Sequence, residues 1–425
     1  MELQDKQSIW LSHRILLRPT NRQVAAFKRA CGVRRFAYNW ALGESRRLHQ
    51  AGEKTSGYDL RVRFNAVKDI QFHWVREVSK WASEKAIYDA WDALKYWWAG
   101  RARCPVFKKR GKCKETFYLH CDSAAVDGRR LRVAKVGTVK MTQEVRFPGK
   151  LKSVTISEEC GRWYAAVMIE LADSYVYPHI CETQEVCGID LGLNNLMAFD
   201  SGECVAPVPV SAHHDRKIRR FNQAIARQLQ GSRNRAKRIA KAGEAHRKVR
   251  MRRMAYLHKI TSEVVRKYRW IGIEDLDVLA MWQRAPIALR LSNASFAEIR
   301  RQLEYKSNLA RATVVVVDRF FPSSKTCSVC GHVVSRLPGG VRAWKCVVCG
   351  TDHDRDVNAA RNLRDVARRQ RDTKNACGED LSPTSLATAA GLVEAGSRQA
   401  LRLYERGHQT CVSSARIVSE AVRGC

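Results

Sequence analysis

Continuous apolar runs in the second half of the chain predict strands that are buried on both faces. Residues 186–189 form the first run, and the segments LMAFD and ECVAPV follow it on either side of a turn at residues 200–202. Residues 270–273 form another run, and the β-branched segment ATVVVVD forms the last. The pattern therefore predicts three consecutive antiparallel strands and two further buried strands.

Helical segments separate these later strands. Residues 211–260 are helical by composition and precede the fourth strand, and a helix is predicted near residues 294–310 before the fifth. A closing helix is predicted to begin in the acidic segment after residue 351. The predicted order fits an RNase H-like α/β core. It consists of three antiparallel strands, a helical insertion, a buried strand, a helix, another buried strand and a closing helix.

The first third of the chain follows a different pattern. Residues 9–18 predict a strand, and helices are predicted from residue 21, at 58–70 and at 81–98. Four short alternating runs with turn residues between them follow in residues 115–172. This alternation predicts a small antiparallel barrel or sandwich.

Aromatic residues are concentrated at the end of the third predicted helix. Trp91, Leu94 and Trp98 recur at helical spacing, which predicts that they face the core. Tyr96 and Trp97 would be able to stack on nucleobases if they are exposed. The sequence alone does not separate core packing from base stacking for these residues.

The charge balance indicates a polyanionic partner. The chain of 425 residues contains 76 Lys and Arg against 42 Asp and Glu, a formal net charge of +34, which favours nucleic acid. The sequence contains no run of about 18 apolar residues, the length needed to span a membrane, and the N-terminus lacks a signal-peptide pattern. Eleven of the fifteen cysteines are scattered without paired spacing, which fits a reducing compartment. The expected location is the prokaryotic cytoplasm or nucleoid, with no membrane as a partner.

Residues 101–112 form a short basic segment with helix breakers at both ends. The breakers predict a loop rather than a helix. Phosphate contact is the expected use of its basic residues, which include Lys108, Lys109 and Arg110.

Residues 211–260 concentrate much more positive charge. They contain sixteen Lys and Arg against only Asp215 and Glu244. A solvated helix face is the ordinary explanation of a charged segment, but so unequal a balance repels itself unless phosphates neutralise it. We therefore expect nucleic-acid contact, and the residues expected to take part include Arg233, Arg235, Lys237 and Arg238.

Four cysteines predict a zinc ribbon. Cys327 and Cys330 form one Cys-x2-Cys pair, Cys346 and Cys349 form a second, and fifteen residues separate the pairs. Each pair can turn two sulfurs toward one tetrahedral ion, and the glycine after each pair allows the tight turn required. Four buried thiols without metal are the alternative, but two pairs at this separation rarely arise by chance. One structural Zn²⁺ is therefore expected.

Three carboxylates stand where a two-metal nuclease needs them. Asp190 ends the first buried strand, Glu274 ends the fourth strand, and Asp356 falls in the first turn of the closing helix. Together they predict a site for two Mg²⁺ ions that activate water for attack on a phosphodiester and stabilise the leaving oxygen. Taken singly, each carboxylate would also fit a strand-end turn or a helix cap.

The segment HDRD offers two aspartates for the third position. Side chains two residues apart on a helix differ in direction by about 200°, so Asp354 and Asp356 cannot both face one pair of metal ions. Val357, Ala360 and Leu363 mark the helix face that is predicted to pack on the sheet. Asp356 adjoins that face whereas Asp354 suits the N-cap, so Asp356 is the predicted ligand.

Several segments resemble the transposon-encoded TnpB family, which is related to compact type V CRISPR effectors. The resemblance is carried by GIDLG at 188–192, IGIEDL at 271–276, FPSSKTCSVCG at 321–331 and HDRDVNAARNL at 353–363, and also by RFAYNWAL at 35–42, PVFKKRG at 105–111 and RRQLEYKSNLA at 300–310. It implies an RNA-guided DNA endonuclease that cuts double-stranded target DNA beside a short flanking motif, with a guide RNA from the transposon end. It also implies Asp190, Glu274 and Asp356 as the catalytic triad and the four cysteines as zinc ligands.

The resemblance divides the chain into parts. The expected parts are a wedge-like β-barrel at 1–20 and 112–180, a helical recognition domain at 21–111, a RuvC-like nuclease domain at 181–323 and 351–375, a zinc ribbon at 324–350 and a mobile tail at 376–425. A DNA-binding repressor with the same fold and a transposase are the alternative functions. A repressor would lose the carboxylates, and the ribbon ahead of the last carboxylate favours the RuvC type over a transposase.

Overall fold

The computed structural model describes residues 9–171, 181, 183–208, 212–282, 291, 293–338 and 340–376. The chain forms two compact units that divide between Tyr175 and Val176. The expected mobile tail, 376–425, falls outside the described residues except for its first residue. Within the described part, no helix is long and apolar enough to cross a membrane.

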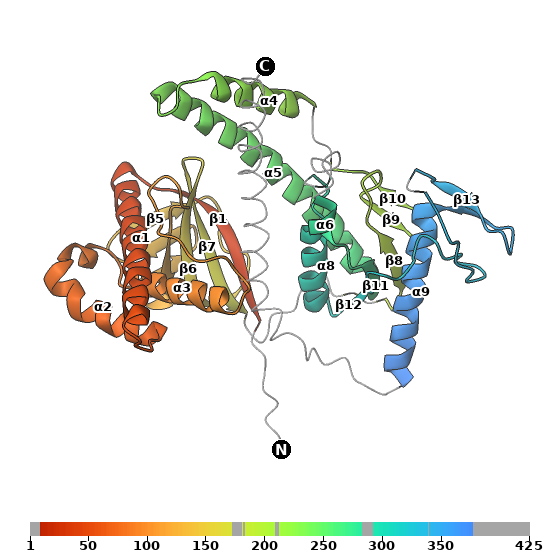
Figure 1. The fold of residues 1–425 in the computed structure, drawn as a ribbon, viewed down its shortest axis with the longest axis horizontal. Helices are drawn as coiled ribbons and strands as arrows, with labels where there is room; N and C mark the ends of the chain where they lie inside the picture. The colour runs from red at the N-terminus through yellow and green to blue at the C-terminus, as the bar shows by residue number, and fades with distance from the viewer. Residues whose placement is uncertain are drawn as a thin grey trace. The chain divides into compact units, whose positions relative to one another are not determined.

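The first unit is a seven-stranded sheet with three α-helices inserted after its first strand (Figure 1). Its helices are α1 (Asn21–Gln50), α2 (Gly57–Gln71) and α3 (Trp81–Trp98), with short 3-10 turns at His73–Glu77 and Cys121–Ser123. Its strands are β1 (Trp10–Arg18), β2 (Thr116–His120), β3 (Ala124–Asp127), β4 (Arg130–Val133), β5 (Gly137–Met141), β6 (Gly149–Glu159) and β7 (Arg162–Leu171). The three α-helices agree with the helices predicted from the sequence.

All strand pairs of this sheet are antiparallel, as the alternation predicted. The hydrogen-bonded order is β2-β6-β7-β1-β5-β4-β3, which has β2 and β3 as its two edges. No ladder joins these edges in the described part of the chain, so the closure that a barrel requires is not confirmed. Phe27 of α1 packs on Phe117 and Trp163 of the sheet, with ring centroids 5.6 and 5.0 Å away, and this contact joins the helices to the strands.

The aromatic end of α3 corrects one prediction. Leu94 is fully buried, but Trp98 is 47% exposed and was wrongly predicted to be core. Trp98 is the last residue of the helix, and its ring meets the half-buried Trp91 edge-on at 5.4 Å instead of entering the core. Tyr96 and Trp97 are 45% and 40% exposed. The condition for base stacking by these two residues is therefore met, although stacking itself stays a prediction.

The second unit contains a five-stranded sheet with helices on both faces (Figure 1). Its strands are β8 (Val186–Asp190), β9 (Met197–Phe199), β10 (Cys204–Val205), β11 (Trp270–Glu274) and β12 (Thr313–Val317), in the order β10-β9-β8-β11-β12. The first three strands are antiparallel, whereas β11 and β12 run parallel to β8. The antiparallel arrangement of the first three strands agrees with the prediction from the apolar runs, which assigned no direction to β11 and β12.

Helices connect and cover these strands. They are α4 (Ala212–Arg227) and α5 (Arg233–Lys267) between β10 and β11, α6 (Val278–Trp282) and α8 (Phe296–Ala310) between β11 and β12, and the closing helix α9 (Arg355–Ala376). Figure 1 shows α5 and α8 on one side of the sheet and α9 on the other. Before α9, β13 (Ala343–Lys345) pairs with β14 (Asp352–Asp354) as an antiparallel hairpin. The acidic cluster therefore belongs partly to a strand, and the helix begins at Arg355, within the acidic segment where it was predicted to start.

Alternation along the central strands decides which residues face α9. Ile271 and Ile273 of β11 pack in the core shared with α5 and α8, whereas Trp270 packs with Leu363 of α9. Because side chains alternate between faces with a period of two, Gly272 and Glu274 face the same side as Trp270. The same rule turns every second residue of β8 toward α9.

Two glycines allow α9 to lie directly on the sheet. A Cβ atom at Gly188 would lie 1.8 Å from the carbonyl oxygen of Ala360, and one at Gly272 would lie 2.4 Å from that of Leu363. No side chain fits at these distances, so the helix backbone touches the strand backbone. Ala360 and Leu363 are fully buried, as predicted for the packing face of this helix, while Val357 is half-buried.

Candidate functional site

Asp190 and Glu274 emerge next to each other from the sheet. Ile189 of β8 and Ile273 of β11 are paired in a parallel ladder, and the two carboxylates directly follow them. Each carboxylate comes two residues after a glycine that contacts α9, so both point to the α9 face of the sheet. The carboxyl ends of two adjacent strands thus supply two of the three predicted ligands from one edge.

Asp356 reaches the same region from the start of α9. The carboxylate of Asp354 accepts hydrogen bonds from the backbone N–H groups of Asp356 and Val357, at 3.0 and 2.9 Å. Asp354 is therefore the N-cap, as predicted, and the Asp356 side chain is left for another role. That side chain is 13% exposed and forms an ion pair with Arg342, whose Nη1 lies 3.0 Å from Oδ1.

Burial and the neighbouring carboxylates make Asp190 costly to ionise. Burial raises the pKa of Asp190 well above its usual range, and the negative charges of Glu274 and Asp356 raise it further. Burial also raises the pKa of Glu274, whereas the hydrogen bond from the hydroxyl of Ser323 and the positive charge of Arg355 lower it. A divalent cation would relieve this repulsion, and carboxylate oxygens are the ligands that Mg²⁺ prefers. The donor set therefore fits Mg²⁺.

The three carboxylates do not form a cage for a single ion. In the described part of the chain, the sulfur atoms of the four ribbon cysteines all lie within 4.8 Å of one another. The carboxylate oxygens of Asp190, Glu274 and Asp356 do not form such a group among the described residues. Two metal ions about 4 Å apart require a wider spread of ligands than one ion does. The charges of Glu274 and Asp356 both act on Asp190, so the structure brings the three predicted side chains into one electrostatic neighbourhood.

Sequence reasoning missed three residues around these carboxylates. Ser323 donates a hydrogen bond from its hydroxyl to Oε1 of Glu274, and Arg342 pairs with Asp356. Arg355 donates its backbone N–H to the carbonyl of Arg342 at 2.7 Å, and its positive charge acts on both Asp190 and Glu274. Ser323 lies 49 residues from its partner along the chain, so no local pattern could have revealed the contact.

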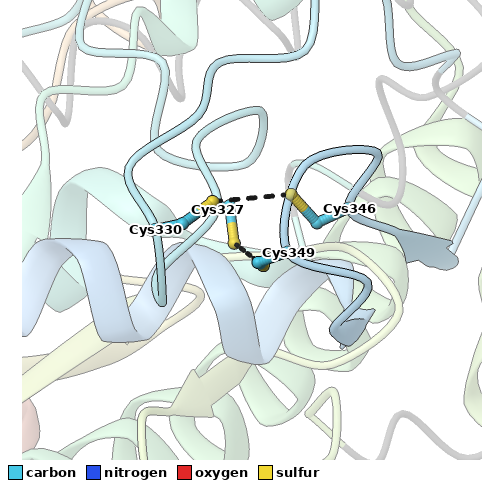
Figure 2. A group of neighbouring side chains, drawn as sticks. All are labelled: Cys327, Cys330, Cys346 and Cys349. Atoms are coloured by element: carbon cyan, nitrogen blue, oxygen red, sulfur yellow. Dashed lines mark hydrogen bonds between the residues drawn. The ribbon is translucent and has the colours of Figure 1, made fainter.

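The four ribbon cysteines point their sulfurs toward one another (Figure 2). The Sγ atoms of Cys327 and Cys349 are 3.6 Å apart, and so are those of Cys330 and Cys346. Four sulfurs arranged tetrahedrally at about 2.3 Å from a zinc ion would be roughly 3.8 Å apart. The cluster therefore fits one Zn²⁺.

Local backbone geometry sets up the sulfur cluster. Gly331 and Gly350 have φ of 76° and 71°, and their N–H groups bond the carbonyls of Cys327 and Cys346 at 2.9 and 3.0 Å. These left-handed turns are the ones that the glycine after each cysteine pair predicted. The hydroxyl of Thr351 lowers the pKa of the Cys349 thiol to about 6, which favours the thiolate that binds metal.

His353 of the HDRD segment belongs to the ribbon rather than to the carboxylate group. Its ring is buried, with Nε2 3.0 Å from Sγ of Cys327. The ring also packs against Trp344 of β13, with the centroids 4.6 Å apart. The strand β14 therefore joins the ribbon directly to the start of α9.

The basic loop near residue 108 is anchored to α1. The backbone of Lys108 exchanges two hydrogen bonds with the side chain of Asn39, at 2.7 and 3.0 Å, and Lys108 Nζ lies 3.3 Å from the Tyr38 ring centroid. Lys109 and Arg110 are exposed. A rigid loop that presents exposed cations suits phosphate contact, which stays a prediction for all three basic residues.

The four residues of segment 211–260 that were predicted to contact nucleic acid differ in their exposure and contacts. Arg233, Lys237 and Arg238 are exposed on the first turns of α5. Arg235 is half-buried and donates from Nη1 to the carbonyl of Gln228 at 2.9 Å, which closes the turn between α4 and α5. The first three are thus available to a phosphate backbone, while Arg235 also stabilises the turn.

Three family models match parts of the chain: "Helix-turn-helix domain" at residues 11–54, "Probable transposase" of the OrfB/IS605 type at 168–285, and "Cas12f1-like, TNB domain" at 296–363. The first matched segment folds here as β1 and the single long helix α1. A TnpB-like protein of Acanthamoeba polyphaga mimivirus, L79, is 26% identical over 42% of this chain and 37% of its own length.

A protein of Streptomyces pristinaespiralis, named as an RNA-guided DNA endonuclease, is 30% identical over 88% of this chain and 92% of its own length. This chain belongs to the TnpB family. Another relative of this TnpB chain is InsQ of Escherichia coli strain K12, also named as an RNA-guided DNA endonuclease. It is 28% identical over 82% of the TnpB chain and 90% of its own length. The similarity to both proteins therefore spans both structural units.

Proposed function

We propose that this protein is an RNA-guided DNA endonuclease whose second unit is a RuvC-like nuclease domain with an RNase H-like core. The observation that carries the proposal is the convergence of Asp190, Glu274 and Asp356 on one face of a mixed five-stranded sheet. A buried carboxylate whose pKa is raised by two neighbouring carboxylates, as for Asp190, is expected where metal ions do chemistry. The names of two long relatives support the same activity.

In this proposal, Asp190, Glu274 and Asp356 hold two Mg²⁺ ions. When bound, the ions supply an activated water and stabilise the leaving oxygen of the phosphodiester. The chain contributes a rigid frame: the β8–β11 ladder fixes Asp190 beside Glu274, and α9 delivers Asp356 to them. Burial of the carboxylates keeps bulk water away and strengthens their attraction for cations.

The proposed partners are a guide RNA derived from the transposon end and double-stranded target DNA. Base pairing with the guide selects the sequence, so the protein needs contacts to phosphates and to a short flanking motif. The excess of positive charge and the exposed cations near Lys109 and on α5 suit that task. The four ribbon cysteines would hold one structural Zn²⁺.

Cleavage accounts for the carboxylates better than binding alone. A guided repressor with this fold would need the basic surfaces, but it would gain nothing from three like charges gathered in a largely buried region. The ion pair of Arg342 with Asp356 and the bond of Ser323 to Glu274 organise these charges. This arrangement supports a nuclease over a repressor.

The test is to express the full chain together with its flanking transposon-end DNA and to sequence the RNA that copurifies. We expect a discrete RNA, and the reconstituted complex should cut a plasmid that matches its guide when Mg²⁺ is present. A library of flanking sequences next to the match would then reveal the motif. A protein without bound RNA, or one that cuts plasmids regardless of the guide, would show that the proposal is wrong.

A further inference from the structure

Ser323 lies in the turn between β12 and the first ribbon cysteine and is almost fully buried, at 3% exposure. Its hydroxyl donates to Oε1 of Glu274, one of the three proposed metal ligands. The next residue, Ser324, is half-buried in the same turn, and its hydroxyl makes no hydrogen bond in the described part of the chain. The two adjacent serines therefore differ in their burial and in the contact with Glu274.

The position of Ser323 is held in turn by α9. The side-chain NH₂ group of Asn362 donates to the carbonyl oxygens of Ser323 and Thr326, both at 2.7 Å. Both donors of this buried amide are thus used. Without them, the carbonyl of Ser323 would lose this partner, which is costly in a buried position, whereas the carbonyl of Thr326 would keep its bond from Asn358.

A second asparagine holds the other end of the same turn. Asn358 is one helical turn before Asn362, so the two side chains lie on one face of α9. Its side chain donates to the carbonyl of Thr326 at 2.7 Å and accepts from the backbone N–H of Ser328 at 3.0 Å. The helix that carries Asp356 in its first turn therefore also holds the segment 323–328, which contains Cys327.

We propose that Ser323 is a positioning residue for Glu274 and that Asn362 fixes Ser323 to the helix of Asp356. The inference rests on the proposed nuclease function. Through this link, the helix that supplies one metal ligand also orients the side chain of another. The hydroxyl engages one oxygen of Glu274 and leaves the second oxygen for a metal ion. Partners that orient a metal ligand in this way typically contribute about 10–100-fold in metal affinity or activity.

The first test compares Ser323→Ala with Ser324→Ala in the complex with guide RNA. We expect Ser323→Ala to raise the Mg²⁺ concentration for half-maximal cleavage about tenfold or more, with zinc content, melting temperature and KM for target DNA close to those of Ser324→Ala. Ser323→Thr keeps the hydroxyl and should restore the Mg²⁺ requirement. An equal Mg²⁺ requirement in the two alanine variants, or loss of zinc or a large fall in melting temperature in Ser323→Ala, would show that Ser323 is not a positioning residue.

The second test assigns the role of Asn362. Asn362→Ala should raise the Mg²⁺ requirement as Ser323→Ala does, because it removes the bond that holds Ser323. Asn358→Ala is the matched control, since it bonds Thr326 and Ser328 but not Ser323. A shift of the same size in both variants would mean that the whole ribbon, and not Asn362, transmits the effect.

A readout without cleavage separates this inference from the proposed function. Calorimetry with Mn²⁺ on the RNA-loaded protein should reveal a binding event that Asp190→Ala lacks, and Ser323→Ala should weaken that event about tenfold. A wild-type complex that binds Mn²⁺ but never cuts DNA would refute the nuclease function and still leave the role of Ser323 decided by the Mn²⁺ affinities. Equal affinities in Ser323→Ala and Ser324→Ala would overturn the inference.

Discussion

At the scale of the residue, Asp354 and Asp356 are two positions apart in the chain, and their side chains have different partners. The carboxylate of Asp354 is bonded to two backbone N–H groups of the first turn of α9. Asp356 turns instead toward Arg342 and contributes to the charge that acts on Asp190. Asp354 ends β14 and caps α9, whereas Asp356 lies in the first turn of the helix. The N-cap position and the apolar face of the helix were enough to predict this division from the sequence.

We predict that Asp356→Ala abolishes DNA cleavage while guide RNA and target DNA remain bound, because binding depends on phosphates and base pairing. Asp354→Ala should retain cleavage and lose about 1 kcal/mol of stability, as expected for a lost N-cap. Plasmid cleavage, gel-shift binding and thermal melting of both variants check the outcome. If a folded Asp354→Ala protein fails to cut and Asp356→Ala still cuts, the third ligand has been assigned to the wrong aspartate.

The sequence was informative about residues whose role follows from local position. Asp190 and Glu274 each end a buried apolar run, and Cys327 to Cys349 repeat a spacing that a metal site requires. Ser323 and Arg342 gave no such signal, since their importance comes from partners brought near by folding. Contacts across long sequence separations depend on tertiary packing, which a single sequence does not specify locally.

At the scale of the element, the ribbon and α9 form one continuous structure. The hairpin of β13 and β14 leads directly into the helix, and Cys327 contacts His353 of β14. The ribbon has little apolar core of its own, because Val329, Val347 and Val348 are largely exposed. Its order is therefore expected to depend on a zinc ion held by the four cysteines and on contacts with α9.

Cys346→Ser should accordingly remove zinc, unfold the ribbon and displace Asp356, so that cleavage falls without any change in the guide sequence. Metal analysis of the purified protein and plasmid cleavage measure the two effects. Cys104→Ser, an exposed cysteine outside the cluster, is the control and should retain both zinc and activity. A wild-type protein that contains no zinc would contradict this prediction.

The helical hairpin of α4 and α5 is the second element with a testable role. Replacing Arg233, Lys237 and Arg238 by Gln should weaken nucleic-acid binding to a similar extent for all sequences and lower the slope of log K against log salt by about two to three. Arg235 is left in place because it closes the turn. Filter binding at several salt concentrations measures the slope, and an unchanged slope would rule out phosphate contact at these positions.

At the scale of the whole molecule, long or strongly apolar segments were predictable, and the strands that were missed are short ones with weak hydrophobic patterns. The helices α1 to α3 and the order of β8 to β12 follow from periodicity and buried runs. Strands β3, β5, β13 and β14 have three to five residues each, too few for alternation to distinguish them from turns. Whether the sheet of the first unit closes depends on pairing between distant edges, and alternation carries no information about that.

The close approach of α9 to Gly188 and Gly272 limits how the sequence of such a protein can evolve once DNA cleavage is no longer needed. Each glycine stands two residues before a proposed catalytic carboxylate on the same strand. A descendant that no longer needs to cut DNA is free to replace Asp190 or Glu274, but it cannot replace either glycine without lifting the helix from the sheet. Loss of the acid beside an intact glycine would therefore identify a lineage that has abandoned cleavage and kept its fold.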